Sequence, residues 1–360
     1  IAVARLCAEL HMDAPTLAAA LLHDTIEDCG VTAEQLRAKF GPDVTLLVEG
    51  ATKIEQLPDR SMDVEQADAE TLRKMFLAMA EDVRVVIVKM ADRLHNMRTL
   101  EHLGSSRQQA LARETMDIYA PLASRLGVWQ FKWELEDLAF RYLEPELYHR
   151  VASMVASRRS ERERYVRQLE HEMSEVLEAA GIKAEVTSRV KRLKSIAEKV
   201  QRYAEQGRAF DQIRDLLALR VFVDTIGDCY HVLGVVHQHW RPIPGTFDDY
   251  IASPKESLYQ SLHTSVLGPA MRPFEVQIRT YEMHQVAVYG VAAHWQYKEG
   301  DSAKRDTQYE DRMAWLRHLL EWQQEASGTE DFLESVRTDV FRDQVFVHTP
   351  KGAEIGRAHV

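Results

Sequence analysis

The sequence predicts a protein of class α + α/β, in which an all-helical part is followed by a part built on a mixed β-sheet. Two observations lead to this prediction. Residues 1–180 carry their apolar side chains mostly at helical spacing, and near Gly181 the pattern changes to the alternation of a strand. In the second part, strand-like segments lie between helical ones, which is typical of a sheet covered by helices over residues 181–298.

The helical part has recognisable start and stop signals. Asp13 can cap a helix whose first turn contains Pro15. Helical periodicity is clearest over residues 85–96 and 107–126. The breaks between helices are predicted at glycines and prolines, namely Gly30, Gly41, Pro42, Pro58 and Gly104.

Two segments of the second part alternate with period two, which predicts strands that have one buried and one polar face. Their apolar positions are Leu219, Val221 and Val223 in one strand and Phe274, Val276 and Ile278 in the other. Helices are predicted over about 228–239 and 281–296.

Length and composition indicate a globular protein. The chain has 360 residues, of which 45% are hydrophobic and 28% charged, and this length suits two or three domains. No apolar run reaches the roughly 20 residues of a membrane span. The net charge of -11 argues against a general DNA-binding surface. Cys7, Cys29 and Cys229 form no disulfide or zinc pattern, so we expect free thiols and a cytoplasmic protein.

Carboxylates interrupt two predicted apolar helix faces. On the first helix, Leu17, Leu21, Asp24 and Asp28 share a face at spacings of three and four, and His23 adjoins Asp24. Asp24 therefore occupies a position where the pattern predicts a core residue.

The second face contains Val85, Val88, Asp92 and Asn96. A buried carboxylate costs on the order of several kcal/mol unless it is paired or becomes neutral. Two carboxylates and a histidine suit a divalent metal such as Mn²⁺, which removes this cost and activates water. The alternative is that Asp92 pairs with Arg93 or Arg98.

Charged residues also gather in the second part. The segment 188–200, SRVKRLKSIAEKV, carries five basic residues and one acidic residue, which suits either nucleotide phosphates or a solvated helix face. Asp215 and Glu275 lie before and within the predicted strands, and paired carboxylates suit Mg²⁺-dependent phosphoryl transfer. Tyr259, with Lys255 and His263 nearby, can stack on a base.

The segments HDTIED and ADRLHNMRT resemble the hydrolase half of the Rel/SpoT homologue family, which belongs to the HD phosphohydrolases. The resemblance implies that His23, Asp24 and Asp92 bind Mn²⁺. Glu27 and Asp28 would handle water and protons, and Asn96 would contact the nucleotide. The family carries a further metal histidine in a His-Pro pair just before a segment like Ile1-Ala2-Val3-Ala4, so we expect that part of the site to lie upstream of this chain.

The segments FDQIRDLLALRVFVD, DCYHVLGVVHQHWRPIPG, YQSLHT, VQIRTYEMH and YGVAAHWQYKEG resemble the synthetase domain of the same family, whose fold is nucleotidyltransferase-like. By this resemblance, Asp215 and Glu275 bind Mg²⁺ and Glu275 is also catalytic. The residues matching nucleotide-binding positions are Arg189, Lys191, Ser195, Lys255, Tyr259, His263, Gln277 and Arg279. The chain departs from the family at Val190, where proline is usual, and at Ser257-Leu258, where Asn-Gly is usual.

The resemblance implies two activities. One is a GTP/GDP diphosphokinase that moves diphosphate from ATP to the 3′-OH of GDP or GTP. The other is a guanosine-3′,5′-bis(diphosphate) 3′-diphosphatase, which returns (p)ppGpp to GDP or GTP plus diphosphate in the stringent response. We expect no membrane or DNA partner, and we expect contacts with the ribosome and uncharged tRNA through regions beyond this chain.

The predicted domains follow from these segments. They are a hydrolase domain over 1–150, a helical connector over 151–180, a synthetase domain over 181–298, a charged helical segment over 299–337 and the start of a TGS β-unit over 338–353. The string EIGRAHV, residues 354–360, breaks the preceding pattern, and we expect it to be a non-native tail.

Two other functions are compatible with these residues. Ser257-Leu258 leaves open a hydrolase with an impaired synthetase. A non-catalytic module that binds alarmone is the other alternative, although such a module has no need for Asp24, Asp92, Asp215 and Glu275 together.

Overall fold

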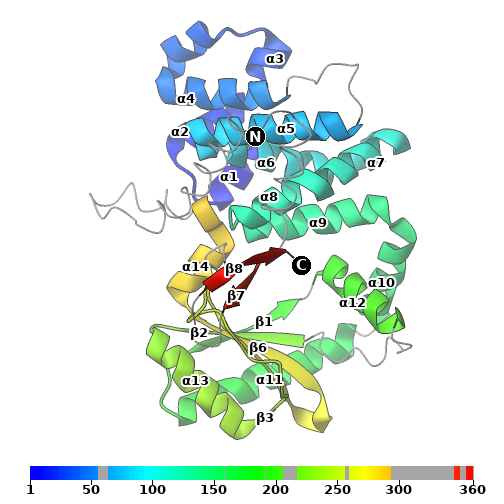
Figure 1. Ribbon diagram of the computed structural model, residues 1–360, viewed down its shortest axis with the longest axis vertical. Helices are drawn as coiled ribbons and strands as arrows, with labels where there is room; N and C mark the ends of the chain where they lie inside the picture. Colours follow the sequence, from blue (N-terminus) through cyan, green and yellow to red (C-terminus); the bar gives the residue numbers. More distant parts are fainter. Residues whose placement is uncertain are drawn as a thin grey trace. The chain divides into compact units, whose positions relative to one another are not determined.

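The computed structural model describes residues 1–55, 64–157, 159–190, 192–205, 217–255, 259–292, 344–348 and 354–359. Contacts divide the chain into two compact units. Unit 1 comprises residues 1–99, 117–125 and 291–360, and unit 2 comprises residues 100–116 and 126–290. The predicted class α + α/β is confirmed, because the described elements up to Ala179 are helices and a mixed sheet follows (Figure 1).

Unit 1 is built around one buried helix. Its helices are α1 (Ala2–Glu9), α2 (Ala14–Leu22), α3 (Thr25–Cys29), α4 (Ala33–Glu55), α5 (Val64–Glu81), α6 (Val83–Arg98) and α8 (Ala120–Arg125). Helix α6 contacts α1, α2, α4 and α5, and Val85 to Ala91 are all buried. A helix that is apolar on all sides is a central core helix, so α6 positions whatever polar groups it carries inside unit 1.

Side-chain caps fix where α2 and α6 begin. Asp13 accepts a hydrogen bond from the backbone N–H of Thr16 at 3.1 Å, as predicted, and Pro15 lies in this first turn. Asp82 caps α6 through the N–H of Arg84. The guanidinium of Arg84 lies 2.7 Å from Asp13 and 2.6 Å from Asp82, so one arginine ties the two helix starts together.

The prediction of one continuous helix through Leu21, Asp24 and Asp28 is wrong. Helix α2 ends at Leu22 and α3 begins at Thr25, and Leu21 is 55% exposed. The reason is local, because side chains take the carbonyl groups at the end of α2. His23 Nδ1 contacts the carbonyl oxygen of Ala20 at 2.9 Å, and Thr25 Oγ1 donates to that of Leu22 at 2.6 Å.

Unit 2 combines helices with the sheet. Its helices are α7 (Ser105–Glu114), α9 (Trp129–Leu143), α10 (Pro145–Ser157), α11 (Arg159–Ala179), α12 (Leu193–Glu205), α13 (Ile226–His239) and α14 (Tyr281–Tyr289). A π-helical turn spans Thr115–Tyr119, and 3₁₀ turns span Leu100–His102, Pro269–Met271 and Gly290–Ala292.

The sheet has six strands, β1 (Glu185–Val190), β2 (Leu217–Val223), β3 (Arg241–Pro242), β4 (Asp248–Asp249), β5 (Leu262–Leu267) and β6 (Pro273–Thr280). Their order is β1-β2-β6-β5-β3, and β4 pairs with β5. Strands β2 and β6 are parallel, with Ala218 opposite Glu275, and the other pairs are antiparallel. The sheet is therefore mixed, as the sequence predicts.

The two faces of the sheet differ in the predicted way. The apolar positions of β2 and β6 form a core with α11 and α13, which lie on the same face in Figure 1. Alternation sends the other set to the opposite face, and its members are Arg220, Phe222, His263, Glu275, Gln277 and Arg279. The polar face is thus supported from behind by the apolar core that the sheet forms with α11 and α13.

Near the end of the chain, β7 (Gln344–His348) pairs antiparallel with β8 (Glu354–His359). A strand is confirmed where the sequence predicts the start of a TGS unit, while the TGS assignment and the non-native origin of 354–360 stay predictions. Residues 299–337 lie outside the described part of the chain. Among the described helices, none has the length and apolar character needed to cross a bilayer.

Candidate active sites

Three of the predicted metal ligands meet in unit 1. His23 Nε2 lies 3.0 Å from Asp24 Oδ2 and 3.5 Å from Asp92 Oδ1. The other ring nitrogen, Nδ1, faces the carbonyl oxygen of Ala20 at 2.9 Å. A carbonyl can only accept, so Nδ1 carries the proton, and in the neutral ring Nε2 is the nitrogen with a free electron pair. The turn between α2 and α3 thereby presents a ligand nitrogen toward α6.

Lys89 is the counter-ion of Asp92. Its Nζ lies 3.1 Å from Asp92 Oδ2, and the Lys89 side chain is 4% exposed. Asn96 Nδ2 donates to Asp92 Oδ1 at 3.2 Å. The cation found beside Asp92 is thus Lys89 and not Arg93 or Arg98, the partners of the alternative interpretation, and Arg93 donates to the hydroxyl of Tyr119 at 3.1 Å.

The charges around Asp92 keep it ionised. Burial opposes ionisation, but the hydrogen bond to His23 and the charge of Lys89 outweigh it and lower the pKa of Asp92 to about 2. Burial also disfavours the imidazolium of His23, yet Asp92 and Asp24 together raise its pKa. Unit 1 therefore holds two carboxylates and an imidazole in one partly enclosed place.

His23, Asp24 and Asp92 are residue types that suit a divalent cation, but in the structure their side chains contact one another. Imidazole and carboxylate are suitable ligands for Mn²⁺. In the described part of the chain, however, no three His, Cys, Asp or Glu side chains are placed to hold a metal ion. Binding at His23, Asp24 and Asp92 therefore requires the side chains to rotate away from their mutual contacts.

The remaining residues predicted for this site lie at its rim. Glu27 and Asp28 are exposed on α3, immediately after the turn that carries Asp24. Asn96 is exposed on the last turns of α6, and its amide is engaged with Asp92. Their predicted roles stay predictions, and their positions leave them accessible to a ligand.

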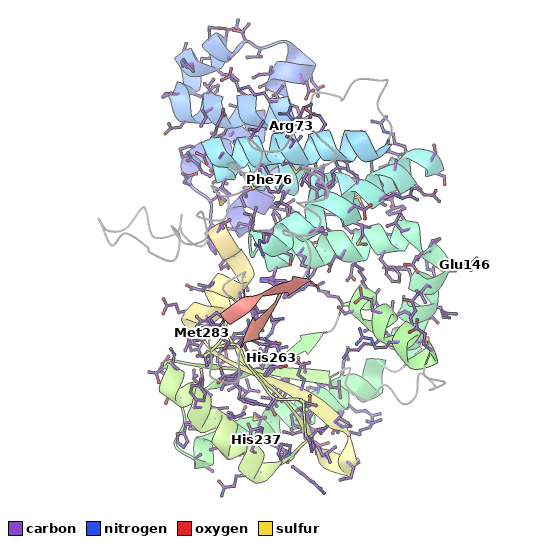
Figure 2. The ribbon with its side chains drawn as sticks, viewed as in Figure 1. Arg73, Phe76, Glu146, His237, His263 and Met283 are labelled. Carbon is purple, nitrogen blue, oxygen red and sulfur yellow. The ribbon has the colours of Figure 1, made fainter. Side chains whose placement is uncertain are left out.

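A second polar cluster lies on the polar face of the unit 2 sheet, where Figure 2 labels His263. The hydroxyl of Tyr259 lies 2.8 Å from His263 Nε2, and His263 Nδ1 lies 3.4 Å from Glu275 Oε1. Gln277 Nε2 donates to the same Glu275 oxygen at 2.7 Å. Arg220 Nε donates in turn to Gln277 Oε1 at 3.4 Å. Side chains from three strands and a loop thus form one continuous network.

The network orients Glu275. A carboxylate oxygen only accepts, so the contact with Glu275 favours the His263 tautomer that carries its proton on Nδ1. Nε2 then accepts from the Tyr259 hydroxyl. Gln277 is fully buried and has one partner on each side, so its amide orientation is fixed by Arg220 and Glu275.

Arg279 places a cation beside the Tyr259 ring, and Lys255 lies close by. The guanidinium of Arg279 lies 5.7 Å from the centroid of that ring and 5.9 Å from that of Phe222, and Arg279 is 2% exposed. Lys255 is exposed, its ammonium lies 4.5 Å from the Tyr250 ring, and its backbone N–H donates to the Tyr259 carbonyl. Four of the predicted nucleotide-binding residues therefore contact Tyr259 or belong to its network, namely Lys255, His263, Gln277 and Arg279.

Of the residues predicted on the ATP side, the structure describes the backbone of Arg189 and the position of Ser195. Ser195 is exposed on the first turn of α12, and Arg189 lies on β1, where its backbone pairs with Ala218. Lys194, from the same basic segment, lies 3.6 Å from Glu198 and 3.9 Å from Glu136. Asp215, Lys191 and Ser257-Leu258 lie outside the described residues.

Four residues close to these sites escaped the sequence reasoning, namely Lys89, Arg220, Tyr250 and Trp129. Lys89 lies three positions before Asp92, a helical spacing at which a counter-ion could have been sought. Arg220 belongs to the polar face by period two. No local pattern connects Trp129 to Tyr259, because 129 residues lie between them in the sequence.

Two family profiles match the chain. The HD domain matches residues 1–129, and a region found in RelA / SpoT proteins matches residues 188–302. The first contains the His23, Asp24 and Asp92 cluster, and the second contains the network of Glu275. Each cluster therefore lies within one matched region.

Curated relatives match nearly the whole chain. A GTP pyrophosphokinase of Streptomyces coelicolor is 50% identical over 98% of this chain and 42% of that protein. A probable guanosine-3′,5′-bis(diphosphate) 3′-pyrophosphohydrolase of Synechocystis is 47% identical over 99% of this chain and 47% of that protein. A bifunctional (p)ppGpp synthase/hydrolase RelA of Mycobacterium tuberculosis is 48% identical over 98% of this chain and 47% of that protein. The chain spans less than half the length of each of these relatives.

Proposed function

Because the chain belongs to the Rel/SpoT homologue family, we propose that it carries the two catalytic domains of an enzyme that makes and degrades (p)ppGpp. Synthesis transfers diphosphate from ATP to the 3′-OH of GDP or GTP, and hydrolysis releases diphosphate from the same 3′ position. The observation that carries the proposal is the presence, in one chain, of the His23-Asp24-Asp92 cluster and the Glu275 network. Each has the chemistry that one of the two reactions requires.

For synthesis, Glu275 is the proposed proton acceptor. The O–H bond of the 3′-hydroxyl breaks, its proton passes to the carboxylate, and the 3′-oxygen attacks the β-phosphorus of ATP, from which AMP leaves. His263 and Gln277 both approach Glu275 Oε1, so they orient the carboxylate before the substrate arrives. Tyr259 provides the ring on which the acceptor guanine stacks.

Mg²⁺ bound by Asp215 and Glu275 would supply charge neutralisation along the phosphates. What supports this pairing is the register of the sheet, in which Ala218, three residues after Asp215 in the sequence, lies opposite Glu275. On the phosphate side we propose Arg189, Lys191, Ser195 and Lys255, with Arg279 held against the Tyr259 ring.

For hydrolysis, His23, Asp24 and Asp92 are the proposed Mn²⁺ ligands, and the bound ion would supply an activated water. Lys89 orients the Asp92 carboxylate through Oδ2, and Asn96 does so through Oδ1, the oxygen that also faces His23. Glu27 and Asp28, exposed beside the cluster, can exchange protons with water and with the leaving diphosphate. Asn96 can reach the nucleotide only if it shares or gives up its bond to Asp92.

The test is direct. The chain is incubated with ATP, GDP and Mg²⁺, and separately with ppGpp and Mn²⁺, and the nucleotides are separated by ion-exchange chromatography. Steady formation of the tetraphosphate excludes the hydrolase with an impaired synthetase. Binding of ppGpp without turnover in either assay would favour the non-catalytic module. We also propose a cytoplasmic location and contacts with the ribosome and uncharged tRNA.

A further inference from the structure

Trp129 opens helix α9 and brings an indole ring to the Tyr259 ring. The two ring centroids lie 6.2 Å apart, and the planes meet at 67°. We infer that Trp129 is a positioning residue of the acceptor site, which holds the Tyr259 ring in the orientation that a guanine base needs for stacking. This inference rests on the proposed function, in which Tyr259 is the stacking residue.

The Tyr259 ring is held from several sides. Tyr250 lies at 6.2 Å and 64°, and His263 lies at 5.8 Å and 84° in addition to its contact with the Tyr259 hydroxyl. The planes of all three rings, those of Tyr250, His263 and Trp129, are steeply inclined to the plane of Tyr259. None of them therefore occupies the position of a stacked base. Tyr250 and His263 belong to the same stretch of chain as Tyr259. Trp129 comes from another layer of unit 2, so it fixes the ring relative to the body of the unit.

The start of α9 is itself fixed. The backbone N–H of Trp129 donates to the carbonyl oxygen of Gly127 at 2.9 Å. Gly290, at the end of α14, has φ +55°, and a Cβ there would lie 2.2 Å from the carbonyl oxygen of Leu126. Only glycine permits both this backbone angle and this approach. The close packing of α14 on residues 126–127 therefore locates the indole.

Neighbours on α9 hold the indole plane. The Trp133 ring lies 5.8 Å from that of Trp129, and the ammonium of Lys132 lies 4.6 Å from the Trp129 ring. The indole Nε1 is buried and has no hydrogen-bond partner within the described residues. Because the ring is held by packing rather than by its N–H, a phenylalanine in its place can keep the contact with Tyr259.

The experiment compares KM for the two substrates of synthesis in the 360-residue chain. Trp129→Leu removes the ring, and we expect the KM for GDP to rise about 2- to 12-fold, the factor that corresponds to one aromatic contact. The KM for ATP is expected to change by less than about twofold on the same scale. Trp129→Phe should restore a KM for GDP close to that of the parent. Thermal unfolding of each variant shows whether the fold is kept.

Tyr142→Leu is the matched control, because it removes an aromatic ring from the other end of the same helix, where the contact described for this ring is with Arg141. A similar rise in the KM for GDP in Tyr142→Leu and Trp129→Leu would overturn the inference, and so would a parallel rise in both KM values. Failure of the parent chain to make any tetraphosphate would instead contradict the proposed function. An active parent whose Trp129→Leu variant keeps its KM for GDP would contradict the inference alone.

Discussion

Lys89 and Asp92 form a buried ion pair one turn apart on α6, with Nζ 3.1 Å from Oδ2. Lys89 is 4% exposed and Asp92 9%, so neither charge is solvated well enough to stand alone. The lysine lets a carboxylate remain ionised on the most buried helix of unit 1, and it leaves the other carboxylate oxygen, Oδ1, facing His23.

Replacing Lys89 with methionine should therefore destabilise the protein. The change leaves a buried carboxylate without its cation, and breaking such a pair costs about 3–5 kcal/mol. Chemical unfolding in urea measures the difference. The control is Lys89→Met combined with Asp92→Leu, which replaces both charges by apolar groups and should recover much of the lost free energy of unfolding. A single variant as stable as the parent would contradict the role of the pair.

Two substitutions should separate the two activities. Asp92→Asn removes the charge of a proposed metal ligand, and we expect Mn²⁺-dependent hydrolysis of ppGpp to fall by about 100-fold or more while synthesis continues.

Glu275→Gln removes the proposed proton acceptor, and synthesis should fall by about 10²- to 10⁴-fold while hydrolysis continues. Each variant is the control of the other. Loss of both activities in either variant would indicate unfolding or a shared site.

The sequence was most informative where periodicity and burial coincide. Period two in β2 and β6 correctly placed the apolar positions in the core beneath the sheet, whereas Phe222, Gln277 and Arg279 on the other face are buried as well. Asp92 was predicted on a core face of α6, and it is buried there. The alternative, in which Asp92 pairs with Arg93 or Arg98, did not consider Lys89, although of the three only Lys89 lies one helical turn from Asp92.

Two other features, the helix break at His23 and the contact of Trp129 with Tyr259, depend on side-chain contacts that hydrophobic periodicity does not reveal. The helix break at His23 arises because His23 and Thr25 bond to the carbonyl groups of Ala20 and Leu22, and competition of this kind leaves no apolar pattern. The contact of Trp129 with Tyr259 joins distant parts of the chain. Such a contact follows from the arrangement of α9 and the sheet, which is a tertiary property.

Asp137 should stabilise helix α12, which begins within the basic segment 188–200. From α9, its Oδ1 accepts a hydrogen bond from the backbone N–H of Lys194 at 3.0 Å, in the first turn of α12. It acts like a capping residue supplied by another helix, so Asp137→Ala should lower the free energy of unfolding by about 1 kcal/mol. Asp137→Asn keeps an acceptor oxygen and should lose less. Equal losses in the two variants in a urea titration would speak against the capping contact.

Acidification should destabilise unit 2 through His284. Burial first, and then the positive charges of Arg279 and Arg220, lower its pKa from 6.5 to about 4. Between these values the unfolded chain binds a proton that the folded chain does not. The free energy of unfolding therefore falls as the pH drops from about 6.5 toward 4. Above pH 6.5 His284 is neutral in both the folded and the unfolded chain, so its titration costs no stability there.

His284→Phe isolates this contribution, because it keeps an aromatic ring against Phe222, whose centroid lies 4.6 Å from that of His284, and cannot bind a proton. We expect the parent to lose more of its Tm between pH 7 and pH 5 than His284→Phe loses. His231→Phe replaces an exposed histidine on α13 and should keep the pH dependence of the parent. If the parent and His284→Phe lose the same amount, His284 does not titrate in this range, and the charges of Arg279 and Arg220 do not act on it as their positions imply.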